Sequence, residues 1–503
     1  MKASISHIYA SAALVSLSSA LVYASAISSP EKKDKDEDKD IVVLSPFTVS
    51  SGFGATPGGA KDARFFRSSV EQGLFPHPST ITAEGLFSEY DLPLKTRVKS
   101  KALLSLNGEA MPAQVLTRPD IRYLAQIGFS SGLDPATWHR EPLNLVAVVD
   151  KSGSMNGKPL DLVKACLLKV LSQLGPEDQM AIVLYGDRSY VHLQPTSTSE
   201  RNKEDIESAI DAIVSAGSTN MEEGLRMGFE LARESQQTFK GRTRVMQFTD
   251  ERPNVGDTSA GGFMGLMEAG SRDGIGQTTI GVGVQFGAEL AAKVSSVRGG
   301  NLFFFPSAAE MEKTFDDELD MLVTELAYDM DLVVHAAPGL RLVGVYGIPG
   351  EMLTWEGERD VRFHLSTLFL SKRRGAIYLA FASDAGDLPE RSYVEGRPLA
   401  SVDLSYREVG RNAPIASRLE LPLVTSSNAS LGLQRGRILV SEYLALKRAM
   451  TAHLTENNQE QAYWTISELH GLLAETRDSS LKKERAMVQG LYRSLSKLSG
   501  HGE

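Results

Sequence analysis

A mostly apolar run at residues 143–149 constrains the fold of this chain more than any other sequence feature. A short polar loop follows it directly, and a helix-compatible segment comes next at 159–174. This order is typical of a parallel strand that is buried on both faces and is followed by its crossover helix. The loop contains Asp150, Ser152 and Ser154. Because ligands of open α/β sheets bind at the carboxyl ends of the strands, the sequence predicts a ligand site at this loop.

Two later segments bring further oxygen atoms to the same edge of the sheet. Thr219 precedes a helical pattern that starts at residue 221, and Asp250 follows an apolar run at 243–248. We therefore expect five side chains to converge on one ion: Asp150, Ser152, Ser154, Thr219 and Asp250. Hard oxygen ligands suit Mg²⁺, Ca²⁺ or Mn²⁺ better than zinc or copper. The alternative is that the three hydroxyl side chains only cap helices.

In this order, the three segments resemble the metal-ion-dependent adhesion site of the von Willebrand factor type A (VWA) domain. The resemblance implies that the serine and threonine hydroxyls bind the ion directly, and that the aspartates bind it directly or through water. It also implies a divalent cation, with Mg²⁺ expected first and Ca²⁺ or Mn²⁺ as alternatives. One coordination position stays open for an acidic group of a protein partner. The family often has glycine after the last aspartate, where this chain has Glu251, a departure that bears on loop shape and local charge.

The VWA-like segment is expected at 141–326, where strand and helix patterns alternate. Such alternation predicts a doubly wound, Rossmann-like α/β sheet. Residues 186–189 suit a tight hairpin that would add one antiparallel edge strand. The predicted strands of this segment are 143–149, 180–185, 190–193, 244–249, 278–284 and 301–305.

The flanking segments predict a β-rich region that the VWA domain interrupts. An N-terminal flanking region at 61–140 is expected to hold short helices at 64–73 and 83–90, followed by strands at 101–106, 111–116 and 121–128. A β-sandwich-like domain is expected at 327–425, with strands at 332–336, 340–346, 361–365, 376–382 and 401–408. Because three short strands make a poor core alone, we expect both strand sets to share one sheet system. The VWA domain would then be an insertion that leaves the sandwich from the end opposite the metal edge.

The C-terminal region, 426–503, is predicted to be a helical bundle with helices at 433–454, 459–475 and 480–498. Its role stays open between a structural cap on the sandwich and a surface that binds a partner. At 503 residues and 42% hydrophobic content, the chain is long and apolar enough for two to four domains.

The N-terminus is typical of an exported protein. Lys2 and His7 precede an apolar, small-residue stretch, and Ala24 and Ala26 form an A-x-A cleavage site. We expect a signal peptide at 1–26; an uncleaved anchor is the alternative. A disordered linker is expected at 27–60, because a run of charged residues there cannot bury apolar surface. The single cysteine, Cys166, excludes an intrachain disulfide and is expected to be a core residue. This combination favours the periplasm or the surface of a bacterium.

The sequence favours binding over catalysis. The G-x-S-x-G match at 128–132 is followed by loop residues instead of the helix that a nucleophile elbow needs. The histidines are scattered, without an H-E-x-x-H or Cys/His cluster, and the net charge of −10 argues against nucleic acid. We therefore predict a non-enzymatic, exported VWA protein that captures an acidic group of a protein partner at the cell envelope, by peripheral association and without a transmembrane helix in the mature chain. The alternatives are a metal-independent structural or assembly protein of the envelope and a metal-dependent hydrolase.

Overall fold

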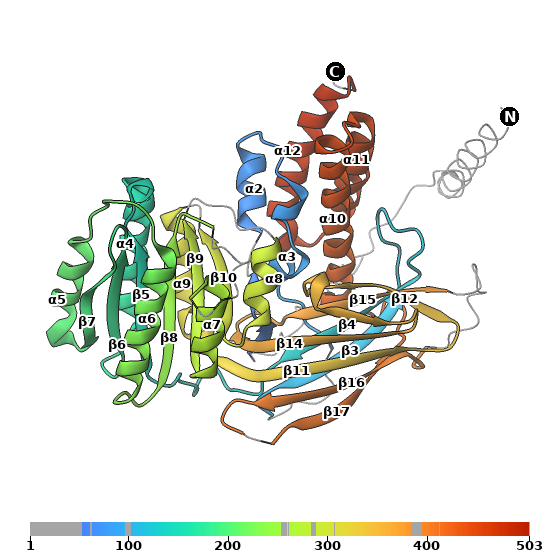
Figure 1. Ribbon diagram of the computed structural model, residues 1–503. Helices are drawn as coiled ribbons and strands as arrows, with labels where there is room; N and C mark the ends of the chain where they lie inside the picture. The colour runs from blue at the N-terminus through green and yellow to red at the C-terminus, as the bar shows by residue number, and fades with distance from the viewer. Residues whose placement is uncertain are drawn as a thin grey trace, which may run out of the picture. The chain divides into compact units, whose positions relative to one another are not determined.

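The computed structural model describes residues 53–60, 63–95, 102–252, 259, 261–282, 288–305, 307–383, 395–411 and 413–501. The predicted signal peptide, and the part of the predicted linker before residue 53, lie outside the described residues. Within them, two β-sheets and a group of helices account for most of the chain (Figure 1).

The first sheet has seven strands in the order β2-β10-β9-β8-β5-β6-β7. All neighbours are parallel except the edge strand β7, which pairs with β6 in the antiparallel sense. This confirms the doubly wound sheet and its hairpin edge. Its strands are β2 (Gly59–Ala60), β5 (Leu143–Asp150), β6 (Gln179–Tyr185), β7 (Tyr190–Ser197), β8 (Arg242–Thr249), β9 (Ile275–Val282) and β10 (Gly300–Phe305).

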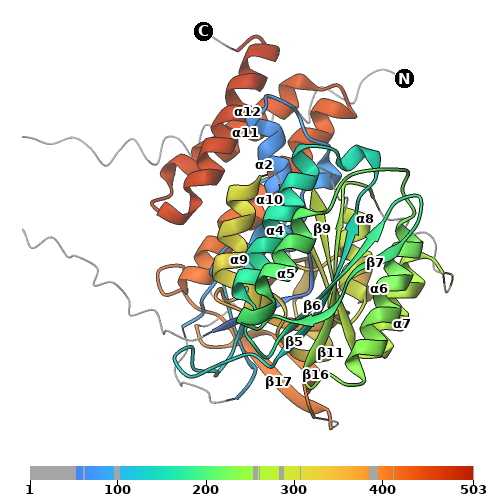
Figure 2. The same cartoon turned by 90° about the vertical axis from the view of Figure 1, so that its left-hand side faces the viewer.

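Helices cover both faces of this sheet, and the alternation of side chains along β5 explains why (Figure 2). Leu145 and Val149 enter one core with α4, α5 and α9, whereas Val146 and Val148 enter a second core with α6, α7 and α8. A strand with apolar side chains on both sides is stable only when both faces are covered. The helices are α4 (Lys158–Gln173), α5 (Glu200–Asp211), α6 (Met221–Gln236), α7 (Phe263–Arg272), α8 (Ala288–Ser296) and α9 (Ala308–Leu322).

The second sheet has ten strands and includes segments from before and after the first sheet in the sequence. β4 pairs with β15, so the two predicted strand sets do share one sheet, as expected for an inserted VWA domain. The strands form one continuous sheet and not two separate layers. Its two outer parts approach each other: the Val424 N–H, just after β17, donates to the Ala110 carbonyl of β3 at 2.7 Å. Its strands are β1 (Gly54–Pro57), β3 (Ser105–Pro112), β4 (Tyr123–Ser130), β11 (Glu325–Ala336), β12 (Leu340–Tyr346), β13 (Leu353–Glu356), β14 (Asp360–Ser371), β15 (Ala376–Ser383), β16 (Pro398–Glu408) and β17 (Ile415–Pro422).

Several strand predictions in this region need correction. The two predicted strands at 101–106 and 111–116 are one strand, β3, which runs through Asn107 and Gly108 because both pair with β4. β13 and β17 were not predicted, since their exposed side chains give no apolar pattern.

The end of the predicted linker is not disordered. Residues 53–60, which we name the N-terminal strap, form β1 between β4 and β14, and then β2 beside β10 of the other sheet. Glycines permit this close passage: a Cβ at Gly54 would lie 2.1 Å from the Arg373 carbonyl oxygen, and Gly59 has a φ of +95°. The strap therefore hydrogen-bonds to both sheets within a few residues.

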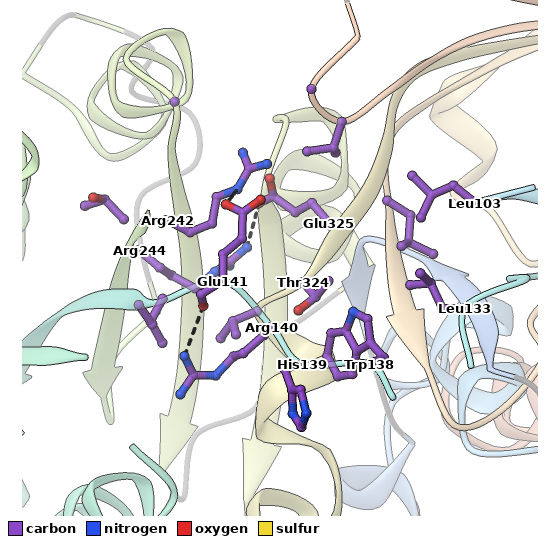
Figure 3. Close-up of a pocket in the computed structure, with 17 residues that line it drawn as sticks. Leu103, Leu133, Trp138, His139, Arg140, Glu141, Arg242, Arg244, Thr324 and Glu325 are labelled. Atoms are coloured by element: carbon purple, nitrogen blue, oxygen red, sulfur yellow. Dashed lines mark hydrogen bonds and ion pairs between the residues drawn. The ribbon is translucent and has the colours of Figure 1, made fainter. Parts of the chain in front are cut away.

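The chain enters and leaves the inserted α/β domain at the end opposite Asp150. Arg140, just before β5, forms ion pairs of 2.5 Å with Asp178 at the start of β6 and with Asp320 in α9. On the exit side, the buried Arg244 pairs with Glu325 at 2.7 Å. A cavity of about 260 Å³ lies between these connections and is lined by Trp138 among other residues (Figure 3).

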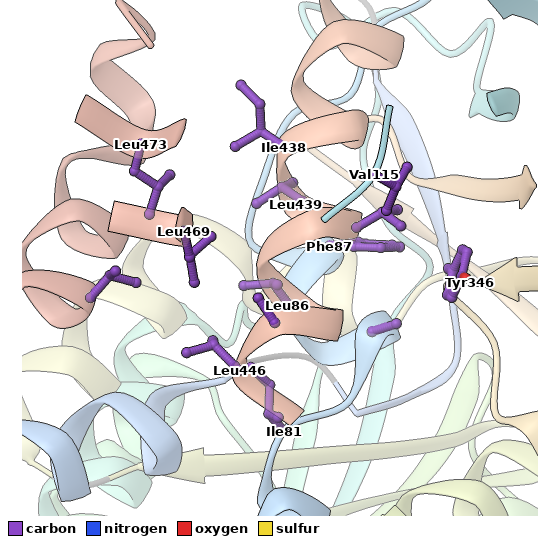
Figure 4. Close-up of a cluster of buried hydrophobic side chains, with 14 of the residues drawn as sticks. Ile81, Leu86, Phe87, Val115, Tyr346, Ile438, Leu439, Leu446, Leu469 and Leu473 are labelled. Carbon is purple, nitrogen blue, oxygen red and sulfur yellow. The ribbon is translucent and has the colours of Figure 1, made fainter. Parts of the chain in front are cut away.

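The C-terminal helices are α10 (Leu431–Leu454), α11 (Gln459–Glu475) and α12 (Lys482–Leu498), close to their predicted bounds. Two helices from the N-terminal flanking region, α2 (Arg64–Glu71) and α3 (Ala83–Ser88), share their apolar core (Figure 4). Leu86 and Phe87 of α3 lie in one cluster with Leu439 and Leu446 of α10. The helical group thus joins segments from the two ends of the described chain.

A buried ionic cluster ties the same segments together. Arg67 of α2 donates to Glu484 of α12 at 2.7 Å and to Glu89 at 2.8 Å, and Tyr90 also donates to Glu484. Glu442 of α10 is fully buried, and neither of its carboxyl oxygens accepts a hydrogen bond from the described residues. Burial, and next the charge of Glu484, raise the pKa of Glu442 well above its ordinary value. Burial therefore favours the protonated, neutral form of Glu442.

We expect Glu442→Gln to raise the melting temperature at about pH 7 and to leave it nearly unchanged at about pH 4. The folded-state pKa of Glu442 is raised, so its contribution to stability is complete below the unfolded pKa and is lost as the pH rises. Glutamine keeps the size and the polarity of the side chain but does not titrate, which removes a loss of at most ~1.4 kcal/mol per pH unit. Thermal melts at both pH values test this, with the exposed Glu460→Gln as control. An equal gain at both pH values would contradict it.

We also expect Gly54→Ala to destabilise the protein by about 1–3 kcal/mol, the usual cost of overpacking. The new methyl group would press on the Arg373 backbone and open the pairing of β1 with β14. Gly350→Ala is the matched control, because nothing lies within 4 Å of a Cβ there. Chemical denaturation of both variants measures the difference; equal stabilities would mean that the strap contributes little to the fold.

Candidate metal centre

The predicted site begins where β5 ends, at Asp150. The Asp150 side chain is fully buried and its carboxylate accepts hydrogen bonds from the Ser152 N–H at 2.9 Å and the Thr249 hydroxyl at 3.2 Å. Ser152 and Ser154 follow in a short 3₁₀ turn at Gly153–Met155 that leads into α4. The strand thus presents the carboxylate, and the turn presents two hydroxyls beside it.

Four of the five predicted residues form a continuous chain of hydrogen bonds. Beyond the contact between Asp150 and Ser152, the Ser152 and Ser154 hydroxyl oxygens lie 3.0 Å apart. The Ser154 hydroxyl then donates to Oδ1 of Asp250, also at 3.0 Å. Adjacent oxygen ligands of an octahedral ion with metal–oxygen distances of about 2.1 Å lie about 3 Å apart. These spacings fit the shell of one divalent cation.

Thr219 lies at the same edge but does not bond to the other four residues. Its hydroxyl donates to Oε1 of Glu251 at 2.9 Å, directly beyond Asp250. Two backbone hydrogen bonds join its loop to the loop after β5: Gly153 N–H to the Gly217 carbonyl at 2.9 Å, and Ala216 N–H to the Lys151 carbonyl at 2.6 Å. Thr219 is therefore held next to the four-residue chain through its backbone and through Glu251.

The alternative that the three hydroxyls only cap helices is not what the structure shows. Ser152 precedes the 3₁₀ turn without a side-chain cap, and Ser154 lies inside that turn. The residue that caps α6 is Asn220, whose side chain accepts from the Glu223 N–H, and not Thr219. The hydroxyls are thus available for another role, and metal ligation by them remains a prediction.

Two glycines bring α6, and with it Thr219, close to the sheet. A Cβ at Gly224 would lie 2.5 Å from the Tyr185 side chain, and one at Gly228 would lie 2.3 Å from the Val148 side chain. Being four residues apart, both glycines face the strands from one side of the helix. This close approach sets the height of the helix start above β5 and β6.

Two acidic residues of the edge were not assigned from the sequence. Glu251 bonds Thr219, and Asp187 accepts from both the hydroxyl and the N–H of Ser218, at 2.6 Å and 2.7 Å. These hydrogen bonds lower the pKa of Asp187. Their positions in the sequence could have indicated them, because Asp187 follows the end of β6 and Glu251 follows the end of β8, where ligands of such sheets bind.

The two aspartates are unfavourably placed without a cation. Burial, together with the charge of Asp250, raises the pKa of Asp150; burial, together with the charge of Glu251, raises that of Asp250. Among the described residues, neither aspartate pairs with a lysine or arginine, and Lys151 turns to the Ala216 carbonyl instead. No group of three or more His, Cys, Asp or Glu side chains in that part of the chain forms a metal site. The two aspartates therefore need the neighbouring hydroxyls beside them to make up a donor set that fits a hard divalent cation.

We expect Asp150→Asn to raise the melting temperature of the cation-free protein by a few degrees at about pH 7, and to abolish the increase that Mg²⁺ gives. Because the pKa of Asp150 is raised in the folded state, this aspartate lowers the stability of the protein as the pH rises above the pKa that it has in the unfolded state. Asparagine does not titrate and has no such effect. Scanning calorimetry with EDTA or Mg²⁺ measures both effects. Asp187→Asn, which should keep the Mg²⁺ response, is the control. If Asp150→Asn keeps the full increase in melting temperature with Mg²⁺, Asp150 is not a ligand of the ion.

Comparison with known proteins identifies the α/β domain that carries this edge. Residues 144–317 match the sequence model of the von Willebrand factor type A domain. Escherichia coli YfbK is 27% identical over 286 residues, covering 54% of this chain and 48% of YfbK. Synechocystis sll0103 is 24% identical over 203 residues, covering 40% of this chain and 47% of its own. The chain thus spans about half the length of these relatives.

Among solved structures, a von Willebrand factor type A protein from Catenulispora acidiphila covers 79% of this chain and 97% of its own, at 12% identity and a TM-score of 0.47. The match to the family model covers the region in which the doubly wound sheet and the five predicted residues lie. The chain therefore contains a von Willebrand factor type A domain.

Proposed function

We propose that this chain is an exported, non-enzymatic protein that binds a divalent cation and uses it to capture a carboxylate of a protein partner at the cell envelope. The ligands would be Asp150, Ser152, Ser154, Thr219 and Asp250. The observation that carries this proposal is the hydrogen bonding that joins Asp150 to Asp250. The Ser152 N–H donates to Asp150 at 2.9 Å, the Ser152 and Ser154 hydroxyl oxygens lie 3.0 Å apart, and the Ser154 hydroxyl donates to Asp250 at 3.0 Å. Such a chain gathers two carboxylates, neither of which pairs with a lysine or arginine among the described residues.

The physical basis of capture is ion sharing. Two aspartates neutralise one divalent cation, and neutral hydroxyls complete part of its shell without adding charge. An ion held in this way keeps a net attraction for a further anionic oxygen, which is strengthened where the site is partly buried. A carboxylate on a partner can then replace a bound water. Mg²⁺ is the first expectation, with Ca²⁺ or Mn²⁺ as alternatives, because all three prefer oxygen ligands.

Catalysis is the poorer proposal for this site. Metal-assisted hydrolysis needs a positioned base in addition to the ligands. Asp150 and Asp250 are committed to the ion in our proposal, and the carboxylate of Glu251 is bonded to Thr219.

Export rests on the predicted signal peptide, with cleavage after Ala26. The helices within the described residues are all too short or too polar to cross a membrane. Mass spectrometry of the N-terminus of the envelope-associated protein tests the cleavage.

We expect the full chain to retain a partner from envelope extract in Mg²⁺ and to release it in EDTA. Asp150→Ala and Asp250→Ala should lose retention by at least tenfold, a change of about 1.4 kcal/mol or more. The control is Asp161→Ala, an exposed aspartate in the first turn of α4. Quantitative pull-down from the extract measures retention. Binding that survives both EDTA and Asp150→Ala would instead support a metal-independent assembly role.

A further inference from the structure

Glu251 is anchored to the same residues that are expected to hold the cation. Its Oε1 accepts from the Thr219 hydroxyl at 2.9 Å, and its N–H donates to the Thr249 hydroxyl at 3.0 Å. That hydroxyl donates in turn to Asp150 at 3.2 Å. Glu251 therefore bridges the two sides of the site, from the end of β8 to the start of α6.

The Glu251 carboxylate lies beside one of the predicted ligands, Thr219. Its 2.9 Å contact with Thr219 equals the spacing of about 3 Å that neighbouring oxygens of one octahedral ion have. The second oxygen of the carboxylate, Oε2, has no partner among the residues that the structure describes. The side chain is exposed, so it can turn toward the ion or away from it without disturbing the core.

We infer that Glu251 is a resident carboxylate of the cation site, which occupies the position that an acidic group of a partner must take. This inference rests on the proposed function and concerns its regulation. When the exposed Glu251 side chain turns toward the ion, three carboxylates surround one divalent cation and leave a net charge of −1, so a fourth carboxylate is repelled unless Glu251 leaves. Capture is then an exchange of one carboxylate for another.

The exchange determines which partners can bind. A carboxylate tethered beside the ion has an effective concentration in the millimolar range or above. Free small acids therefore compete poorly with Glu251. A carboxylate on a folded protein surface competes better, because its other contacts with the domain add to the binding energy. The site thus selects a protein partner over dissolved carboxylates.

The test uses Mn²⁺ as the probe, with the full chain and the variant Glu251→Gln. Electron paramagnetic resonance measures the Mn²⁺ affinity, and water-proton relaxation measures the exchangeable waters on the bound ion. We expect Glu251→Gln to bind Mn²⁺ on the order of tenfold more weakly, since carboxylate count sets such affinities. The bound ion should gain one exchangeable water, and acetate should displace that water more readily than in the unchanged chain.

Glu222→Gln is the matched control. Glu222 lies in the first turn of α6, so this substitution removes the same charge near the site without removing a contact to Thr219. Glu251→Asp keeps the charge but shortens the side chain, and should behave like Glu251→Gln if direct occupancy matters. If Glu251→Gln and Glu222→Gln give the same affinity, hydration and acetate response, the inference is wrong while the proposed function stands. Absence of Mn²⁺ binding by the unchanged chain would overturn both.

Discussion

The buried carboxylate of Asp150 is the constraint on which the ligand edge depends. A carboxylate at the end of a fully covered strand must accept hydrogen bonds or become protonated, because its charged form is costly away from water. The Ser152 N–H and the Thr249 hydroxyl meet this need and fix two loops around it. Gly224 and Gly228 let α6 pack close to the sheet, which brings the loop that carries Thr219 near Asp150. Folding thus gathers two aspartates whose mutual repulsion a divalent cation would relieve.

The part of the structure that could be predicted is the part that local patterns specify. The apolar run at 143–149 predicted a doubly covered strand, and the residues at its end predicted a ligand edge, because strand direction determines which loops meet. Asp150, Ser152, Ser154 and Asp250 lie together for this reason. The bond between Thr219 and Glu251 could not be predicted, since side-chain direction in a loop depends on the packing of α6 against the sheet.

Long-range pairing was the part that sequence patterns did not specify. The N-terminal strap was expected to belong to a disordered linker because a run of charged residues precedes it. Only its pairing with β4, β14 and β10 makes it a strand. Likewise, α2 and α3 were predicted as helices, but their place against α10 and α12 rests on a core and an ionic cluster built from distant segments. Such contacts leave little trace in either sequence segment alone.

The strap also bears on the order of folding. Gly54 pairs with Ser371, so a strand from the start of the described chain completes its hydrogen bonds only after β14 has been synthesised. Pairing over such a sequence separation is slow, because a long loop must close before any contact forms. Until then, β1 lacks the strand with which it pairs over its whole length. The N-terminal strap therefore stays without its main pairing until most of the chain has been made, and during that time its backbone groups are exposed to other binding partners such as chaperones.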